Sequence, residues 1–136
     1  MIDIRLMKKE EASEVKNLIF KILSHKINKE YENSKSSFTI VATNEEKIIA
    51  AMTIFIHDDI LGGEKSYFVS NLCVDNDYRR NGIATKMLDY VEELAHKENV
   101  KYVYTLVPIK YLEANNLYAK MNYDIKNINC YRKEIC

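Results

Sequence analysis

Arg79, Arg80 and Gly82 lie within one short stretch and combine fixed positive charge with a flexible backbone, as an anion-binding loop requires. Residues 67–74 before them are rich in β-branched and aromatic side chains and predict a strand. Apolar residues with helical spacing follow, so Gly82 is expected where a strand has ended and a helix begins. The first N–H groups of a helix have no intrahelical partner and lie at the positive end of its dipole. The loop therefore predicts a phosphate or pyrophosphate site.

Two common phosphate-binding motifs are excluded. The dinucleotide fingerprint needs three spaced glycines and a later acidic residue, and the P-loop needs Gly-Lys-Ser or Gly-Lys-Thr. Neither pattern occurs in this sequence. An unrelated phosphate-binding α/β domain, or a plain strand–turn–helix joint with two solvated arginines, remains open from these residues alone.

With Leu72-Cys73-Val74 ending the strand before it and a long helix after it, the pattern Arg79-x-x-Gly82-x-Ala84 resembles the acyl-CoA signature of the GNAT superfamily of N-acetyltransferases. The resemblance implies acetyl-CoA as cosubstrate. Its pyrophosphate would bind mainly through backbone N–H groups of Arg79, Arg80, Asn81, Gly82, Ile83, Ala84 and Thr85. Its pantetheine arm would pair like an added strand with the main chain of Leu72, Cys73 and Val74.

Residues 114–123 resemble a second motif of that family, an apolar helical turn and a tyrosine followed by Gly-Phe, with Asn122-Tyr123 in place of Gly-Phe. The resemblance makes Tyr118 the general acid that returns a proton to the CoA thiolate. Helical spacing alone would make Tyr118 a core residue. Tyr111 occupies the position of the family's asparagine, and Asn115, about one turn before Tyr118, is the residue that could replace it at the cofactor.

The general base is left open. Many members of that family carry a glutamate on the strand before the loop, but no carboxylate occurs between Glu64 and Asp75. A water relay through Ser70 or Asn71 is one solution, and a base from another element, such as His57 or Asp58, is a second. A substrate amine of low pKa would need no base at all.

The elements that position these residues follow from their periodicity. Strands are expected over residues 2–6, 38–42, 48–56, 67–74 and 102–107, with closing strands at 123–125 and 131–135. Helices are expected over residues 10–23, 82–98 and 109–121, the last anchored by Leu112, Leu117 and Met121, with a short helical turn around Tyr31. Asn99 and Asn122 suit left-handed helix caps. The fold class is α/β: a GNAT-type mixed, mainly antiparallel sheet with a central parallel βαβ pair and helices on both faces.

The amino-acid composition limits the kinds of partner that can be expected. The chain has 136 residues, which suits a single N-acetyltransferase (GNAT) domain over residues 1–136. Its 20 acidic and 20 basic side chains leave no basic excess, so neither nucleic acid nor a membrane is expected as a partner. Three cysteines and three histidines are scattered, which predicts no metal site and reduced thiols in a cytoplasmic protein. No membrane span or signal pattern is expected.

These inferences predict an enzyme that moves an acetyl group from acetyl-CoA to a primary amine by direct attack in a ternary complex. The Val74 N–H would polarise the thioester carbonyl. The alternative is a catalytically silent acyl-CoA-binding sensor or regulatory module. Acceptor specificity would lie in residues 25–37 and 57–64, where the acidic residues could attract a cationic amine, and the acceptor itself is not identified. A terminal strand at 131–135 could pair two copies into a homodimer.

Overall fold

The computed structural model describes residues 1–24, 27, 33–58 and 63–136. The chain forms two compact units, Met1–Leu106 and Val107–Cys136. The helical turn expected around Tyr31 lies outside the described residues.

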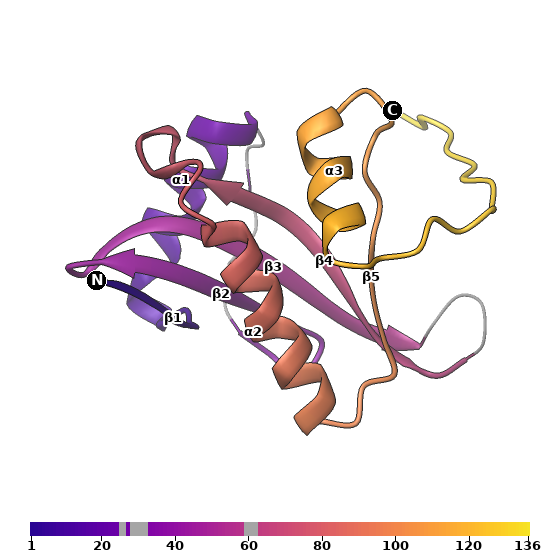
Figure 1. Cartoon of the computed structure of the whole chain (residues 1–136), viewed down its shortest axis with the longest axis horizontal. Helices are drawn as coiled ribbons and strands as arrows, with labels where there is room; N and C mark the ends of the chain where they lie inside the picture. The colour runs from indigo at the N-terminus through magenta and orange to yellow at the C-terminus, as the bar shows by residue number, and fades with distance from the viewer. Residues whose placement is uncertain (25–26, 28–32, 59–62) are drawn as a thin grey trace. The chain divides into compact units, whose positions relative to one another are not determined.

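The first unit is built on a mixed sheet whose strands follow one another in sequence order, β1-β2-β3-β4-β5 (Figure 1). The strands are β1 (Ile2–Leu6), β2 (Ser37–Asn44), β3 (Lys47–Asp58), β4 (Lys65–Val74) and β5 (Tyr102–Thr105). The first four pair antiparallel, and β5 pairs parallel to β4. The mixed sheet with a βαβ pair is therefore confirmed.

A two-residue turn joins β2 to β3. Glu45 and Glu46 both have left-handed φ angles, 50° and 70°, which is the conformation of tight hairpin turns that match the twist of their strands. Because the turn is this short, both strands run further toward it than their apolar patterns predict, to Asn44 and from Lys47.

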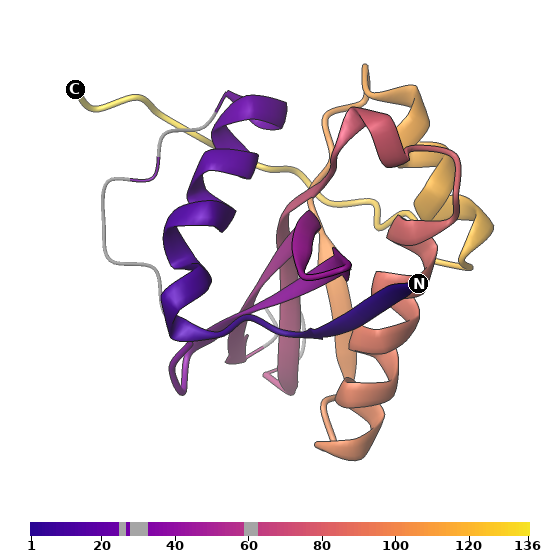
Figure 2. The same ribbon diagram turned by 90° about the vertical axis from the view of Figure 1, so that its left-hand side faces the viewer.

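Helices cover both faces of this sheet. Figure 2 shows α1 (Ala12–Leu23) on one face and α2 (Ile83–Lys97) on the other. The apolar stripes predicted from the sequence are the buried ones: Val15, Leu18 and Ile19 on α1, and Ile83, Met87, Leu88, Val91 and Ala95 on α2. Asn99, with φ of 58°, takes the left-handed conformation expected after α2.

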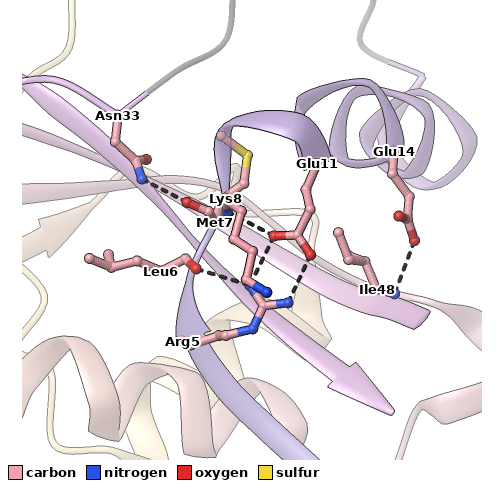
Figure 3. A network of polar contacts seen from close by, with 8 residues as sticks. All are labelled: Arg5, Leu6, Met7, Lys8, Glu11, Glu14, Asn33 and Ile48. Carbon is pink, nitrogen blue, oxygen red and sulfur yellow. Dashed lines mark hydrogen bonds and ion pairs between the residues drawn. The ribbon is translucent and has the colours of Figure 1, made fainter. Parts of the chain in front are cut away.

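Polar contacts fasten the start of α1 to the sheet (Figure 3). The Arg5 guanidinium donates two hydrogen bonds to the Glu11 carboxylate, at 2.9 and 2.8 Å. Glu11 ends the short 3-10 helix η1 (Lys9–Glu11) and also accepts from the Lys8 backbone N–H at 2.7 Å. The hydrogen bonds from Arg5 lower the pKa of Glu11 to about 2. Glu14 adds a bond from the Ile48 N–H, so β1, α1 and β3 are held together.

The second unit has one helix, α3 (Leu112–Lys120), and its residues 121–136, all described, contain neither helix nor strand. The strands predicted at 123–125 and 131–135 are therefore wrong. Each rested on a few apolar residues between polar ones, and Ile125, Tyr131 and Ile135 are 97%, 89% and 81% exposed. With so little apolar surface buried, nothing offsets the entropy of ordering a strand there. Leu112, expected as an anchor, is also exposed.

Candidate functional site

The parallel pairing of β4 with β5 ends before β4 does. The last pair is Val69 with Thr105, whereas β4 continues to Val74. The Thr105 hydroxyl donates to the Val69 carbonyl at 2.8 Å, so a side chain ends the ladder at that point. Among the described strands none pairs with β4 residues 70–74 on the side of β5. The strand predicted to 107 is thus shorter, and the shortening leaves a strand edge to which an extended ligand could add.

An extra residue in β4 bends it at the same place. Ala51 and Thr53 of β3 are two residues apart, but their β4 partners, Cys73 and Ser70, are three apart. Asn71 lies inside this bulge with φ of 51°. Bulges of this kind re-aim the strand that contains them. The bend precedes Leu72, Cys73 and Val74, the residues predicted to pair with pantetheine.

Cys73 offers only its main chain to a ligand. Its side chain is 4% exposed and belongs to the apolar cluster beneath α1. Burial raises the pKa of the Cys73 thiol to about 11, so the thiol is scarcely ionised near neutral pH. The Cys73 side chain therefore acts as core packing and not as a reactive thiol.

Asp75 turns the chain from β4 toward the loop. Its buried carboxylate accepts from the Asp77 N–H at 3.0 Å and lies 3.5 Å from the Lys21 ammonium. The hydrogen bond from Asp77 and the charge of Lys21 lower the pKa of Asp75. This carboxylate begins the 3-10 helix η2 (Asn76–Tyr78) and so sets where the arginines emerge. Asp75 was not among the residues predicted for the site, although an aspartate directly after a strand is a common turn-forming residue.

The arginine loop alternates between extended and left-handed conformations. Arg79 is extended, while Arg80 and Gly82 have φ angles of 67° and 70°. The Asn81 amide donates to the backbone carbonyls of Tyr78 and Arg79, at 3.0 and 3.3 Å, and braces the loop from inside. All four residues 79–82 are exposed. A Cβ placed at Gly82 would meet no atom within 4 Å in the part of the chain that the structure describes, so the space above this glycine is open there.

The loop leads directly into α2, as predicted. Gly82 is the N-cap, and the first intrahelical bond runs from the Lys86 N–H to the Gly82 carbonyl. The N–H groups of Ile83, Ala84 and Thr85 precede that bond, so they have no acceptor within the helix. The Ile83 side chain is buried, and only its backbone is available to a ligand. Backbone donors, two arginines and a helix dipole therefore converge on one exposed turn.

Tyr118, the predicted general acid, lies on α3 in the second unit. It is 9% exposed, and its ring meets that of Tyr123 edge to face with centroids 5.2 Å apart. Asn122 has the left-handed φ, 66°, expected after the helix, and the Tyr123 N–H bonds back to the Tyr118 carbonyl at 3.0 Å. The motif thus forms a defined helix end.

The amide of Asn115 closes the first turn of α3. Its nitrogen donates to the carbonyls of Pro108 and Tyr111, at 3.0 and 2.7 Å. Since an amide nitrogen has two hydrogens, both are used within the unit. A role for Asn115 at the cofactor stays a prediction and would have to use its side-chain oxygen.

The acidic segment at 57–64 is only partly described, and residues 59–62 lie outside the structure's described ranges. Glu64 lies 3.9 Å from the Lys101 ammonium. The Tyr104 hydroxyl and His57 Nε2 lie 2.5 Å apart in a hydrogen bond that joins β3 to β5. His57 was among the candidate bases that the sequence left open, whereas its contact with Tyr104 was not predicted. The alternation of residues 102–105 could have placed Tyr104 on the face opposite Val103.

Two other kinds of feature are absent from residues 1–24, 27, 33–58 and 63–136. No group of three or more His, Cys, Asp or Glu side chains there could hold a metal ion. No helix in those ranges has the length and apolar character to cross a membrane.

Comparison with known families matches residues 6–123 to the acetyltransferase (GNAT) family. The matched range includes the arginine loop and the helix end at Tyr118. No protein of curated function matches the chain significantly.

Solved structures of similar fold span nearly the whole chain. A possible acetyltransferase from Clostridium difficile 630 superposes with a TM-score of 0.83 at 18% identity, covering 100% of this chain and 99% of that one. A ribosomal-protein-alanine N-acetyltransferase from Brucella melitensis biovar Abortus 2308 superposes with a TM-score of 0.82 at 16% identity, covering 98% of this chain and 99% of that one. AAC(6')-Iy in complex with a bisubstrate analogue, CoA-S-monomethyl-acetylneamine, superposes with a TM-score of 0.86 at 14% identity, covering 99% of each chain. At these identities the likeness establishes the fold.

Proposed function

Because the chain belongs to the GNAT acetyltransferase family, we propose that it transfers an acetyl group from acetyl-CoA to a primary amine by direct attack in a ternary complex. The observation that carries this proposal is the end of the β4–β5 ladder at Val69 and Thr105 beside an exposed helix start. An edge for an extended arm and a cradle for a pyrophosphate occur in one continuous segment, residues 70–85. CoA has both parts.

The cofactor would be held mainly by the backbone. N–H groups from Arg80 to Thr85 would bind the pyrophosphate. Arg79, whose own N–H donates to the Asn76 carbonyl at 3.4 Å, would supply charge together with the exposed Arg80. The pantetheine arm would pair with residues 72–74 beyond the end of the ladder. Val74 would direct its N–H at the thioester carbonyl and stabilise the negative charge that develops on its oxygen.

Tyr118 would complete the reaction as the general acid. When the tetrahedral intermediate collapses, sulfur leaves as a thiolate and takes the phenolic proton. A phenol has a pKa of about 10 and a thiol one of about 8.5, so this transfer needs a positioned donor. A tyrosine that is nearly buried and packed against Tyr123 has few rotamers to choose from.

The acceptor is proposed as an amine without further identity. Aminoglycoside acetyltransferases occur among the similar structures, and that fact makes an aminoglycoside a reasonable first probe. We also propose a cytoplasmic location, where acetyl-CoA is made and thiols stay reduced. The homodimer stays a prediction, but the terminal strand that motivated it is absent from residues 131–135. Light scattering at micromolar concentration measures the oligomeric state.

Calorimetry with acetyl-CoA tests the cofactor half of the proposal. At a hundredfold excess over Kd, binding should stabilise the wild type by about 2.7 kcal/mol. Gly82→Val should abolish binding, because its side chain would fill the open space over the loop. Gly63→Val is a matched control, since Gly63 has the same left-handed φ and a Cβ placed there would meet no atom of the described residues within 4 Å. It should lose similar stability and keep CoA affinity.

Turnover measurements test the second half of the proposal, which is the transfer of the acetyl group to an amine. Acetyl-CoA is offered with an aminoglycoside, a polyamine and a peptide amine, and free thiol is measured. Amine-dependent release of CoA supports the transferase. Tight binding of CoA without turnover of any amine would instead support the acyl-CoA sensor, and absence of CoA binding would reject both.

A further inference from the structure

Asp75 places a buried negative charge at the base of the arginine loop. The residue is 4% exposed and directly follows β4. Its N–H donates to the Ile49 carbonyl at 2.7 Å, and its carbonyl accepts from the Tyr78 N–H at 2.9 Å. Because the fold uses both of these main-chain groups, Asp75 is fixed between β3 and the short helix η2 that leads to the arginines.

The two oxygens of this carboxylate have different partners. Oδ1 accepts from the Asp77 N–H at 3.0 Å, and Oδ2 lies 3.5 Å from the Lys21 ammonium in the last turn of α1. The side chain of Lys21 is 61% exposed, whereas that of Asp75 is 5% exposed. The ion pair therefore joins a cation that water still solvates to an anion that has lost most of its contact with water.

The two partners of such a pair depend on each other unequally. An exposed lysine loses little when its partner is removed, but a buried carboxylate without its cation is an uncompensated charge. In this chain that charge would lie four residues before Arg79, where the loop proposed to hold the pyrophosphate begins. It would repel the phosphates and attract the arginines, and both effects oppose the binding of CoA.

The other charged groups around Asp75 do not replace Lys21. The pKa of Asp75 is lowered first by the hydrogen bond from Asp77, then by Lys21, and least by Lys47 of β3. The Lys47 ammonium lies over the Tyr78 ring, 5.8 Å from its centroid. Asp77 is itself negative, and Arg79 is a cation that the phosphates need. Among the described residues, Lys21 alone has its charged group within ion-pair distance of Asp75.

We propose that Lys21 is a positioning residue for CoA: it neutralises the Asp75 carboxylate and so leaves the arginine loop free to bind the pyrophosphate. This inference rests on the proposed function. It adds a residue of α1, outside the segment 70–85 that would contact the cofactor. Because Lys21 acts through Asp75, its contribution to CoA affinity should vanish when residue 75 carries no charge.

A double-mutant cycle measured by calorimetry with acetyl-CoA tests this dependence. Lys21→Met removes the ammonium and should raise Kd about three- to tenfold at low salt. Asp75→Asn removes the charge but keeps an oxygen that can accept from the Asp77 N–H, so Kd should not rise above the wild-type value. In the double variant, Kd should return to within about twofold of the wild type.

Two further lysine variants are controls. Lys21→Arg keeps the charge and should keep the affinity. Lys16→Met removes a lysine of the same helix that forms no ion pair among the described residues, and it should leave Kd unchanged. In turnover assays Lys21→Met should raise KM for acetyl-CoA and leave kcat close to that of the wild type. A lysine that only stabilised the fold would lower the free energy of unfolding without raising KM.

The outcomes distinguish the role of Lys21 from the proposed function. If the wild type does not bind acetyl-CoA, both are rejected. If Lys21→Met binds as tightly as the wild type, or the double variant keeps the loss, the role of Lys21 is rejected and CoA binding stands. Should Asp75→Asn fail to fold, salt gives the test. The ratio of Kd for Lys21→Met to that for the wild type should fall toward one between about 0.01 and 1 M salt, and a constant ratio would overturn the role of Lys21.

Discussion

The units Met1–Leu106 and Val107–Cys136 use their apolar side chains in opposite ways. In the first, whole rows of strand and helix residues are buried, among them Ile19, Ile40, Ile49 and Leu88 at 0% exposure. In the second, Tyr118 is the one residue classed as buried. Its other large apolar side chains include the exposed Ile109, Tyr111, Leu112, Ile125, Ile128, Tyr131 and Ile135.

This difference bears on how the proposed chemistry is divided. The arginine loop is held by a continuous sheet with two covering helices. Tyr118 depends on a nine-residue helix and the tyrosine packed beside it. Segments with few buried apolar contacts open more readily than cores do. We therefore expect cofactor binding to tolerate perturbations of the second unit that turnover does not tolerate.

Paired isoleucine substitutions should show the largest contrast. Ile40→Ala in the first unit removes a fully buried side chain and should cost 2–5 kcal/mol of unfolding free energy, about the range for core truncation. Ile125→Ala in the second unit removes a side chain that is 97% exposed and should change stability by less than about 0.5 kcal/mol. Urea unfolding measures both. Equal losses would mean that residue 125 has a partner in solution.

Tyr118→Phe should affect turnover more than stability. The ring and its contact with Tyr123 remain, so CoA affinity should hold, while kcat falls at the low end of about 10²–10⁴-fold because a thiolate is a fairly stable leaving group. Any alkaline limb of the pH–rate profile that belongs to this tyrosine should also disappear. Tyr131→Phe, an exposed change in the same unit, is the control. Turnover within about threefold of wild type would reject Tyr118 as the acid.

An acid titration of stability should distinguish substitutions of two glutamates at helix starts: Glu11, the N-cap of α1, and Glu113, in the first turn of α3. The pKa of Glu11 is lowered from 4.5 to about 2, so its stabilising contribution is complete above pH 4.5 and is lost as pH falls toward 2. Glu11→Gln should cost about 1–2 kcal/mol at pH 7, allowing for solvent screening, and about nothing near pH 2. Glu113→Gln should change little. A constant difference for Glu11→Gln across this range would contradict the Arg5 contact as its cause.

Alkylation of the cysteine thiols should show the smallest difference between the two units. It is a difference in labelling rate and not in stability. Cys130 and Cys136 of the second unit are exposed, whereas burial raises the pKa of Cys73 to about 11. Mass spectrometry at pH 8 should find two rapid adducts on the native protein and a third only after unfolding. Rapid labelling of Cys73 would mean that β4 opens at its end.

Local features could be predicted from the sequence because a few neighbouring residues determine them. The loop at Arg79, Arg80 and Gly82, the helix start behind it and the left-handed caps at Asn99 and Asn122 depend on backbone preferences and dipoles within single turns. The apolar stripes of α1 and α2 are periodic over three turns or more, so their buried faces were also predictable.

Tertiary structure decided what depends on distant partners. The ladder between β4 and β5 ends where the Thr105 hydroxyl donates a hydrogen bond to the Val69 carbonyl. The Tyr104 hydroxyl forms a hydrogen bond with His57, which is 47 residues away in the sequence. No local pattern contains either contact. The absent closing strands show the same dependence. A short apolar run becomes a strand only where the edge of another strand pairs with its backbone and a core buries its side chains. Residues 123–135 contain neither helix nor strand, so their apolar residues alone did not determine a strand.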